Sequence, residues 1–285
     1  ILALADEADT GMTLDDWDRL SRVTPLLCRI KPNHPQNTFV DFAAAGGVYK
    51  LMDTMSGMLN LDRRMVTGRT LGEMLQGWRA LNIPCEDNGV IAALDNPVSP
   101  NGGIRVLYGN LATEGCIIKT SAIAKQVDRF EAAARVFNSE VDAARALFGG
   151  EIKGKTVLVV RYEGPKGAPG ARELMMLMHA IVGMGRIEDV AVVTDGRFSG
   201  TNLGVAVGHV CPEAPNGGPI ALVEDGDTVV IDIENRELNL LVDEKTMAER
   251  KARWAAPAPK ANKGLLREWA EKGGSLSHGG ILGRY

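Results

Sequence analysis

The feature that most constrains the fold is a run of buried-type residues that leads directly into a glycine-rich loop. Residues 156–160 read TVLVV, one threonine followed by four aliphatic side chains, which is typical of a strand covered on both faces. A loop with three glycines follows, and residues 173–182 then predict a methionine-rich helix. Residues 190–193 form a second buried run. Strands that alternate with helices in this way predict a mixed or parallel sheet with helices packed against it.

The surrounding segments extend this pattern into a mixed α/β fold. Four further β-type runs occur at 104–108, 116–119, 229–233 and 238–242. The last two flank a turn at Asn235 and predict a β-hairpin. Residues 128–147 predict a long helix, and residues 248–254 predict a short basic one. Together these elements predict a mixed-sheet β-barrel of the swivelling type with flanking helices.

The first third of the chain has helical periodicity instead. Thr70, for example, precedes such a stretch and is suited to cap its N-terminus. Two prolines and two glycines within residues 95–103 make the strongest break in the chain, so we place a domain boundary there, between 1–98 and 99–285. Because the chain opens directly into an amphipathic pattern without a cap, we expect residues 1–98 to be the C-terminal part of an α/β domain that begins upstream.

Charge and cysteine usage narrow the function classes. The formal net charge is −4 and the pI is about 5.7, which excludes a general electrostatic attraction to nucleic acid or to an anionic membrane. No apolar run in the sequence approaches the roughly 20 residues needed to span a bilayer. The four cysteines are widely separated, at positions 28, 85, 116 and 211, as expected for reduced thiols in the cytoplasm. A small molecule is therefore the expected partner.

Two motif matches have ordinary structural explanations. Residues 149–156 satisfy the phosphate-binding pattern GxxxxGK[ST], but that loop must follow a strand and precede a helix. Here a predicted helix precedes the motif and a predicted strand follows it, so we interpret it as a helix-to-strand turn. His209 and Cys211 are spaced like half of a metal site, but no second pair accompanies them in the sequence. We interpret these two residues as packed side chains.

The loop after the first buried strand is a candidate binding site. It reads EGPKGAPG and runs into a helix, the arrangement in which backbone N–H groups approach an anion closely. The residues expected to bind substrate or anion here are Gly164, Pro165, Lys166, Gly167 and Gly170. The spacing is not GxGxxG, so a dinucleotide is not expected. Glu163 and Glu173 bracket the loop and are candidate Mg²⁺ ligands, while a tight turn without a ligand stays an open alternative.

The loop after the second buried strand repeats this geometry. It reads DGRFSGTN and places Ser199 and Gly200 between a strand end and a stretch of small residues, much as a nucleophile elbow presents its hydroxyl. GRFSG is not GxSxG, and no His or Asp partner can be assigned from spacing, so an ordinary serine in a turn stays an open alternative. Because both loops follow strands, we expect them to line one mouth of the sheet.

Several blocks of the sequence together are similar to one known family. RYEGPKGAPGARELM and TDGRFSGTNLGVAVGHVCPEAPNGGPIALVEDGD closely resemble two blocks of the dihydroxy-acid dehydratase and phosphogluconate dehydratase family. The family has further blocks in the same order. They are similar to three stretches of this chain, PLLCRIKPN, VTGRTLGE and GGIRVLYGNLATEGCIIKTSA. The resemblance covers nearly all of this chain and corresponds to the second part of the family's chain.

The resemblance implies a two-domain subunit with an iron–sulfur cluster and a Mg²⁺ ion at the domain interface. In this family the cluster cysteines and most Mg²⁺ ligands, including a modified lysine, belong to the first part of the chain. None of the four cysteines here falls in a cluster-ligand motif. Glu173 then corresponds to the Mg²⁺ ligand from the second part, and Ser199 to the catalytic base. Thr201 matches a hydroxyl residue that lies beside the base in sugar-acid members.

The implied activity is that of a dehydratase, a hydro-lyase that converts a 2,3-dihydroxy carboxylic acid into a 2-keto-3-deoxy acid. The hydroxyl and amide groups of residues 199–202 favour an aldonic (sugar) acid. A branched-chain dihydroxy acid of amino-acid biosynthesis is the alternative substrate. A non-catalytic barrel that binds a small acid, or a phosphate- or nucleotide-binding enzyme that uses the 164–170 loop, also stays open. We expect a homo-oligomer, dimer or tetramer, and we expect this chain alone to be inactive.

Overall fold

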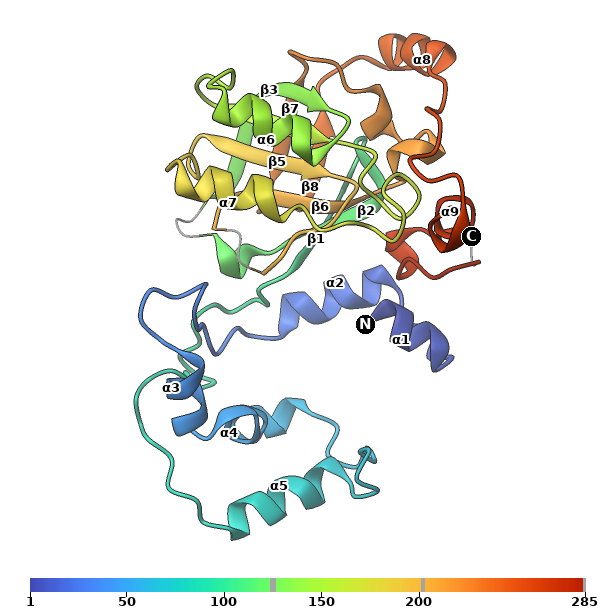
Figure 1. The fold of residues 1–285 in the computed structure, drawn as a ribbon. Coiled ribbons are helices and arrows are strands. Elements are labelled where there is room, and N and C mark those ends of the chain that lie inside the picture. Colours follow the sequence, from blue (N-terminus) through green and yellow to red (C-terminus); the bar gives the residue numbers. More distant parts are fainter. Residues whose placement is uncertain (124–126, 201–202, 284–285) are drawn as a thin grey trace. The chain divides into compact units, whose positions relative to one another are not determined.

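A computed structural model describes residues 1–123, 127–200 and 203–283 (Figure 1). The chain divides into two compact units, which we call the barrel unit (residues 1–20 and 104–285) and the helical unit (residues 21–103). These units are groups of contacting residues. The assignment of 1–98 to one domain of the whole protein therefore stays a prediction.

Short capped helices build the helical unit. They are α3 (Phe39–Ala44), α4 (Gly47–Thr54), the 3₁₀ turn η1 (Ser56–Met58) and α5 (Leu71–Ala80). Thr38 and Thr70 each begin a capping box, in which the threonine hydroxyl accepts a backbone N–H and an acidic side chain three residues later accepts the N–H of the threonine. This exchange satisfies two donors that a helix start leaves open. The helix predicted after Thr70 is confirmed.

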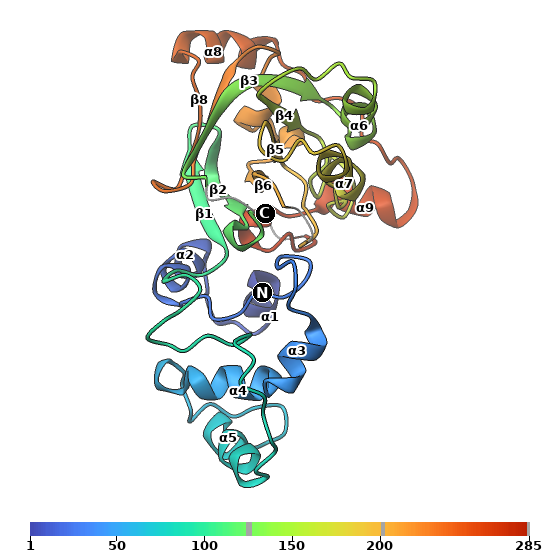
Figure 2. The same ribbon diagram turned by 90° about the vertical axis from the view of Figure 1, so that its left-hand side faces the viewer.

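The barrel unit begins with two helices and continues into a closed sheet. The helices are α1 (Leu2–Glu7) and α2 (Leu14–Val23), of which α2 runs on into the helical unit. Among the described residues, eight strands form the sheet: β1 (Arg105–Gly109), β2 (Ala112–Ile118), β3 (Arg129–Phe137), β4 (Thr156–Val160), β5 (Val190–Thr194), β6 (Ala206–Cys211), β7 (Thr228–Asp232) and β8 (Glu237–Leu240). They close in the order β1-β2-β6-β5-β4-β3-β7-β8 (Figures 1 and 2). Neighbours from β3 to β6 are parallel, whereas β1-β2, β2-β6, β3-β7 and β7-β8 are antiparallel. The predicted mixed barrel and the predicted hairpin are confirmed.

The central strands are covered on both faces, which explains their continuous apolar runs. In β4, Val157 and Val159 belong to the core inside the barrel. Leu158 and Val160 belong to a second core with α6 (Glu140–Phe148) and α7 (Met175–Gly183). These two helices lie side by side over β4 and β5 (Figure 1). Each apolar side chain therefore leaves water whichever way it points, and the strand needs no polar face.

The helix predicted over 128–147 is wrong in its first half. Residues 129–137 form β3, and α6 begins only after Ser139, whose hydroxyl accepts the backbone N–H of Asp142. Three consecutive alanines at 132–134 favour a helix locally, but β3 pairs with β4 on one side and β7 on the other. Those ladder bonds and the burial of the strand outweigh a propensity difference of less than about 1 kcal/mol per residue.

The remaining elements of the barrel unit are two helices and four 3₁₀ turns among the described residues. They are the helices α8 (Glu244–Arg253) and α9 (Gly264–Lys272) and the 3₁₀ turns η2 (Thr120–Ala122), η3 (Ala214–Asn216), η4 (Pro219–Leu222) and η5 (Leu276–His278). The GxxxxGK[ST] match is confirmed as a helix-to-strand turn, because α6 precedes it and β4 follows it. None of the helices in the described ranges is long and apolar enough to cross a membrane.

Candidate active site

The two candidate loops start at the same edge of the barrel. β4 and β5 are parallel neighbours, with Val160 opposite Thr194 at their carboxyl ends. The glycine-rich loop leaves β4 at this edge, and the GRFSG loop leaves β5 beside it. Carboxyl ends of parallel strands are the usual position of ligand sites in α/β folds, because loops from neighbouring strands converge there.

A backbone contact joins the end of the first loop to the second. Glu173 forms a parallel β-bridge with Arg197, and the N–H of Leu174 donates to the carbonyl oxygen of Arg197 at 2.9 Å. The guanidinium Nε of Arg197 donates in turn to the carbonyl oxygen of Ala171 at 2.7 Å. Ser199 follows Arg197 by two positions. The structure thus brings the segments of Glu173 and Ser199 together, although they follow different strands.

Glu173 has the properties required of a metal ligand. Its side chain is half-buried, and among the described residues no hydrogen bond or ion pair involves its carboxylate. A carboxylate oxygen without a protein partner suits Mg²⁺, which prefers oxygen ligands and usually keeps several waters. Within the described ranges no cluster of three or more His, Cys, Asp or Glu side chains could hold a metal. Glu173 is therefore a candidate to supply one ligand, and the described residues place no cluster of further ligands beside it.

Ser199 lies next to a lysine that sequence reasoning missed. Ser199 is half-buried, and the Nζ of Lys119 donates to the carbonyl oxygen of the following residue, Gly200, at 3.0 Å. Lys119 directly follows β2, and its partial burial lowers the pKa of its ammonium group. Its position at the end of a β-type run was readable from the sequence, but its proximity to the GRFSG loop was not. Thr201, the other predicted catalytic residue, lies outside the described residues.

The glycine-rich loop is packed against the interior of the barrel unit. A Cβ atom on Gly164 would lie 2.5 Å from Oε2 of Glu213, and one on Gly167 would lie 2.6 Å from the backbone of Tyr162. The N–H groups of Lys166 and Gly167 donate to the Glu213 carboxylate at 3.1 and 3.2 Å. These donors, which we expected to bind an anionic ligand, therefore have an internal acceptor.

Further along the loop, the N–H of Gly170 donates to the carbonyl oxygen of Pro165 at 3.0 Å. Lys166 and Gly167 also line a cavity of about 340 Å³, together with Tyr162 and the linker residues 256–260. Substrate binding by this loop stays a prediction.

Two buried carboxylates anchor both loops. Asp195 is fully buried and accepts the N–H groups of Tyr162, Glu163 and Ala214 at 2.9 to 3.1 Å. Burial raises the pKa of Asp195. Burial and the neighbouring Asp195 charge raise the pKa of Glu213 to about 7. These residues connect the loop after β4 with the segment after β6, so they position the site.

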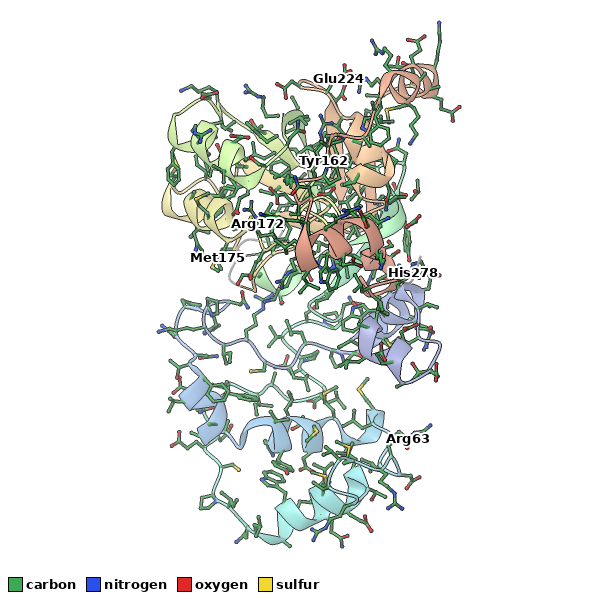
Figure 3. All side chains as sticks on the ribbon, turned by 45° about the vertical axis from the view of Figure 1, so that its right-hand side comes forward. Arg63, Tyr162, Arg172, Met175, Glu224 and His278 are labelled. Atoms are coloured by element: carbon green, nitrogen blue, oxygen red, sulfur yellow. The ribbon has the colours of Figure 1, made fainter. Side chains whose placement is uncertain are left out.

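Glu163 is enclosed by protein, with partners for its Oε1 and no hydrogen-bond partner for its buried Oε2 among the described residues. It is fully buried, and its Oε1 accepts the backbone N–H of Glu140 at 2.9 Å and a guanidinium N–H of Arg172 at 3.2 Å. The ammonium of Lys260 lies 3.5 Å from the same oxygen. Arg172 precedes Glu173 in the sequence, and Met175 is the first residue of α7 (Figure 3 labels both). Of the two candidate Mg²⁺ ligands, Glu173 is thus the accessible one, and Glu163 stabilises the start of the loop.

The barrel cysteines do not resemble the ligands of an iron–sulfur cluster. Cys116 in β2 and Cys211 in β6 are both buried, and Cys116 is part of the barrel core. Clusters of this kind are usually held by four thiolates, and the described barrel residues bring two thiols near each other. His209 is half-buried and donates its backbone N–H to the carbonyl oxygen of Gly196 at 2.8 Å.

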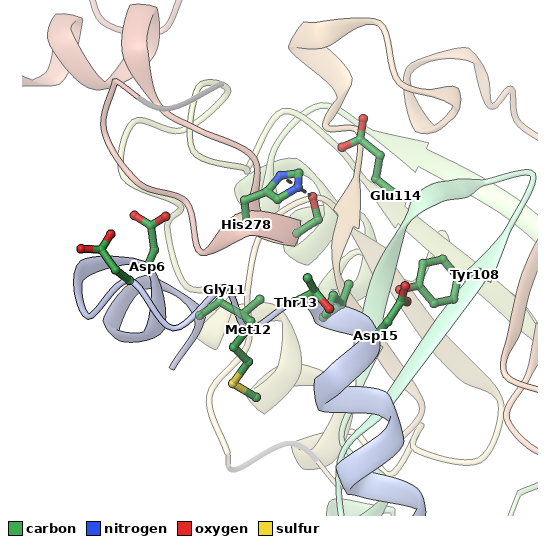
Figure 4. A pocket seen from close by; sticks show the side chains of 12 residues that line it. Asp6, Gly11, Met12, Thr13, Asp15, Tyr108, Glu114 and His278 are labelled. Atoms are coloured by element: carbon green, nitrogen blue, oxygen red, sulfur yellow. Dashed lines mark hydrogen bonds between the residues drawn. The ribbon is translucent and has the colours of Figure 1, made fainter.

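A further pocket of the barrel unit lies elsewhere. It has a volume of about 590 Å³ and is lined by α1, the start of α2, β1, β2 and η5. In Figure 4, His278 and Glu114 face it from one side, and Tyr108 donates to Asp15 at 2.5 Å on the other. None of the candidate catalytic or metal-binding residues lines it. Tyr285, at the end of the segment that contains His278, lies outside the described residues.

Comparison with known proteins places this chain in a family. Residues 89–280 match the model of the dihydroxy-acid/6-phosphogluconate dehydratase C-terminal region, and residues 1–74 match that of the N-terminal region. A dihydroxy-acid dehydratase from Methanothrix thermoacetophila is 45% identical over 98% of this chain and 51% of its own length. Those from Ignicoccus hospitalis and Pyrococcus abyssi are each 44% identical, over 98% and 99% of this chain and 50% of their own lengths.

The chain spans about half the length of the curated relatives that it matches. Both family models match the chain, and the relatives are similar over nearly all of its residues. The chain therefore belongs to the dihydroxy-acid/6-phosphogluconate dehydratase family, a family of hydro-lyases.

Proposed function

We propose that this chain supplies the barrel side of a dehydratase that converts a 2,3-dihydroxy carboxylic acid into a 2-keto acid. The observation that carries the proposal is the backbone bridge between Glu173 and Arg197, which sets a carboxylate that has no partner among the described residues beside the loop of Ser199. A metal-binding carboxylate and a proton acceptor at one site are what the reaction requires, because the substrate must lose a proton next to a carboxylate.

In the proposed reaction Ser199 removes the proton from C2, and the hydroxyl at C3 departs as the C2–C3 double bond forms. The resulting enol takes up a proton at C3 and becomes the 2-keto acid, with one water released overall. A Mg²⁺ ion held by Glu173 would stabilise the negative charge that develops next to the substrate carboxylate. A serine hydroxyl acts as a base only if its pKa is strongly lowered, so cationic groups near Ser199 are essential to this proposal.

We further propose a branched-chain dihydroxy acid as the substrate. The preference for an aldonic acid rested on the polar groups of Thr201 and Asn202, both of which lie outside the described residues. The relatives from Methanothrix, Ignicoccus and Pyrococcus are all named dihydroxy-acid dehydratases, which supports the alternative substrate class over the sugar acids. A dimeric or tetrameric state and a cytoplasmic location stay predictions.

The decisive experiment measures keto-acid formation by the complete protein, purified without oxygen and supplied with Mg²⁺. A branched-chain dihydroxy acid and a set of aldonic acids are offered separately, and a Ser199→Ala preparation controls for contaminating enzymes. Product from the branched acid alone supports the proposal. Product from an aldonate alone would instead support the prediction of an aldonic acid as the substrate. No product from either, with the cluster present by absorbance, would favour a non-catalytic barrel that binds a small acid.

A further inference from the structure

Lys119 connects the end of β2 to the loop that carries Ser199. β2 pairs with β6, and Ile118, the last residue of β2, lies opposite Val207. The Lys119 side chain then reaches the GRFSG loop, where its Nζ donates to the carbonyl oxygen of Gly200 at 3.0 Å. A Cβ atom on Gly200 would lie 3.0 Å from the same Nζ. The glycine therefore allows the ammonium to approach the backbone closely.

This ammonium is a suitable source of positive charge for the proposed base. Lys119 is half-buried, so solvent screens its charge less than it screens that of an exposed lysine. Arg197 precedes Ser199 by two positions but is exposed, and its Nε is bound to the carbonyl oxygen of Ala171. Of these two cations, Lys119 is thus the more enclosed. A nearby cation favours the ionised form of an acidic group.

We infer that Lys119 is a positioning residue of the dehydration. Its ammonium fixes the backbone at Gly200 against the end of β2, and its charge favours the ionised form of the Ser199 hydroxyl. The inference rests on the proposed role of Ser199 as the base. Lys119 then contributes to turnover rather than to substrate binding. A change in kcat reports the first role, and a change in KM reports the second.

The test compares Lys119→Met with Lys119→Arg in the complete protein, with Lys153→Met as the matched control. Lys153 is an exposed lysine of the same unit, in the turn between α6 and β4. We expect Lys119→Met to lower kcat by about 10²-fold with KM changed by less than about threefold, because the Ser199 hydroxyl then ionises less readily while substrate contacts remain. Lys119→Arg keeps the charge and should recover kcat to within about tenfold of wild type. Lys153→Met should match wild type.

An unchanged kcat in Lys119→Met would overturn the inference. A large rise in KM with kcat retained would overturn it too, and would assign Lys119 to substrate binding. Circular dichroism and cluster absorbance verify folding, and Lys119→Gln replaces the methionine variant if that variant does not fold. Turnover retained in Ser199→Ala with loss in Lys119→Met would refute the proposed base and with it this inference. Wild-type protein without keto-acid product would refute the proposed function itself.

Discussion

Glu173 and Arg197 pair as a parallel β-bridge, and this contact fixes the end of the glycine-rich loop against the start of the GRFSG loop. The pairing is made by backbone atoms, with the N–H of Leu174 donating to the Arg197 carbonyl oxygen at 2.9 Å. The Glu173 side chain takes no part in this pairing. The backbone therefore fixes the segment of Glu173, the proposed metal ligand, against the segment that leads to Ser199, the proposed base.

Ser199→Ala should abolish most of the turnover of the complete protein. Loss of the proton acceptor is expected to lower kcat by about 10²- to 10⁴-fold, with cluster content and fold unchanged, as measured by keto-acid formation and absorbance. Ser139→Ala is the matched control, since its hydroxyl caps α6 and its loss should cost about 1 kcal/mol of stability without affecting kcat. A kcat of Ser199→Ala close to wild type would contradict the base assignment.

Glu173→Gln should weaken the binding of Mg²⁺ to the enzyme. The amide keeps the size of the side chain and leaves the backbone bridge intact, but it removes the charged ligand. We expect the Mg²⁺ concentration for half-maximal activity to rise by at least about tenfold, with Mg²⁺ calorimetry as a second measurement. Glu151→Gln, at an exposed position before β4, is the control. Identical Mg²⁺ titrations for wild type and Glu173→Gln would place the ligand elsewhere.

Glu213→Gln should change how stability depends on pH. The pKa of Glu213 is raised from 4.5 to about 7 in the folded chain by burial and by Asp195. The folded state then binds more protons than the unfolded state between pH 4.5 and about 7, so this carboxyl makes stability fall as pH rises through that window. The loss amounts to on the order of 3 kcal/mol and is complete above the folded pKa.

Glutamine cannot ionise but keeps a carbonyl acceptor for the N–H groups of Lys166 and Gly167. The difference in unfolding free energy between wild type and Glu213→Gln, from urea titrations at several pH values, should therefore move in favour of the variant as pH rises from 4.5 to 7. Parallel curves over this range would show that Glu213 titrates normally.

Gly167→Ala should destabilise the barrel unit. The added Cβ would lie 2.6 Å from the backbone of Tyr162, and relieving that overlap is expected to cost about 1 to 3 kcal/mol. Gly183→Ala is the control, because Gly183 ends α7 and has nothing within 4 Å of its added Cβ. Alanine there should leave stability unchanged or raise it by up to about 1 kcal/mol. Equal melting temperatures for the two variants would show that the loop can shift away from Tyr162.

The sequence determined the elements whose signals are local. The β4 run, the β5 run and the hairpin of β7 and β8 appear at the predicted places, because continuous or turn-flanked apolar patterns need no distant partner to be recognised. The helix after Thr70 follows from its capping box for the same reason. The sequence blocks around Glu173 and Ser199 were also sufficient to identify the family.

Only the tertiary structure decided which segments meet. It turned the alanine-rich residues 129–137 into β3 between two neighbouring strands, against their local preference. It gave the N–H groups of Lys166 and Gly167 an internal acceptor in Glu213, and it brought Lys119 to Gly200. These contacts join residues far apart in the chain, and their energies come from burial and pairing with those distant partners. A local sequence pattern does not identify such distant partners, so only the folded barrel shows them.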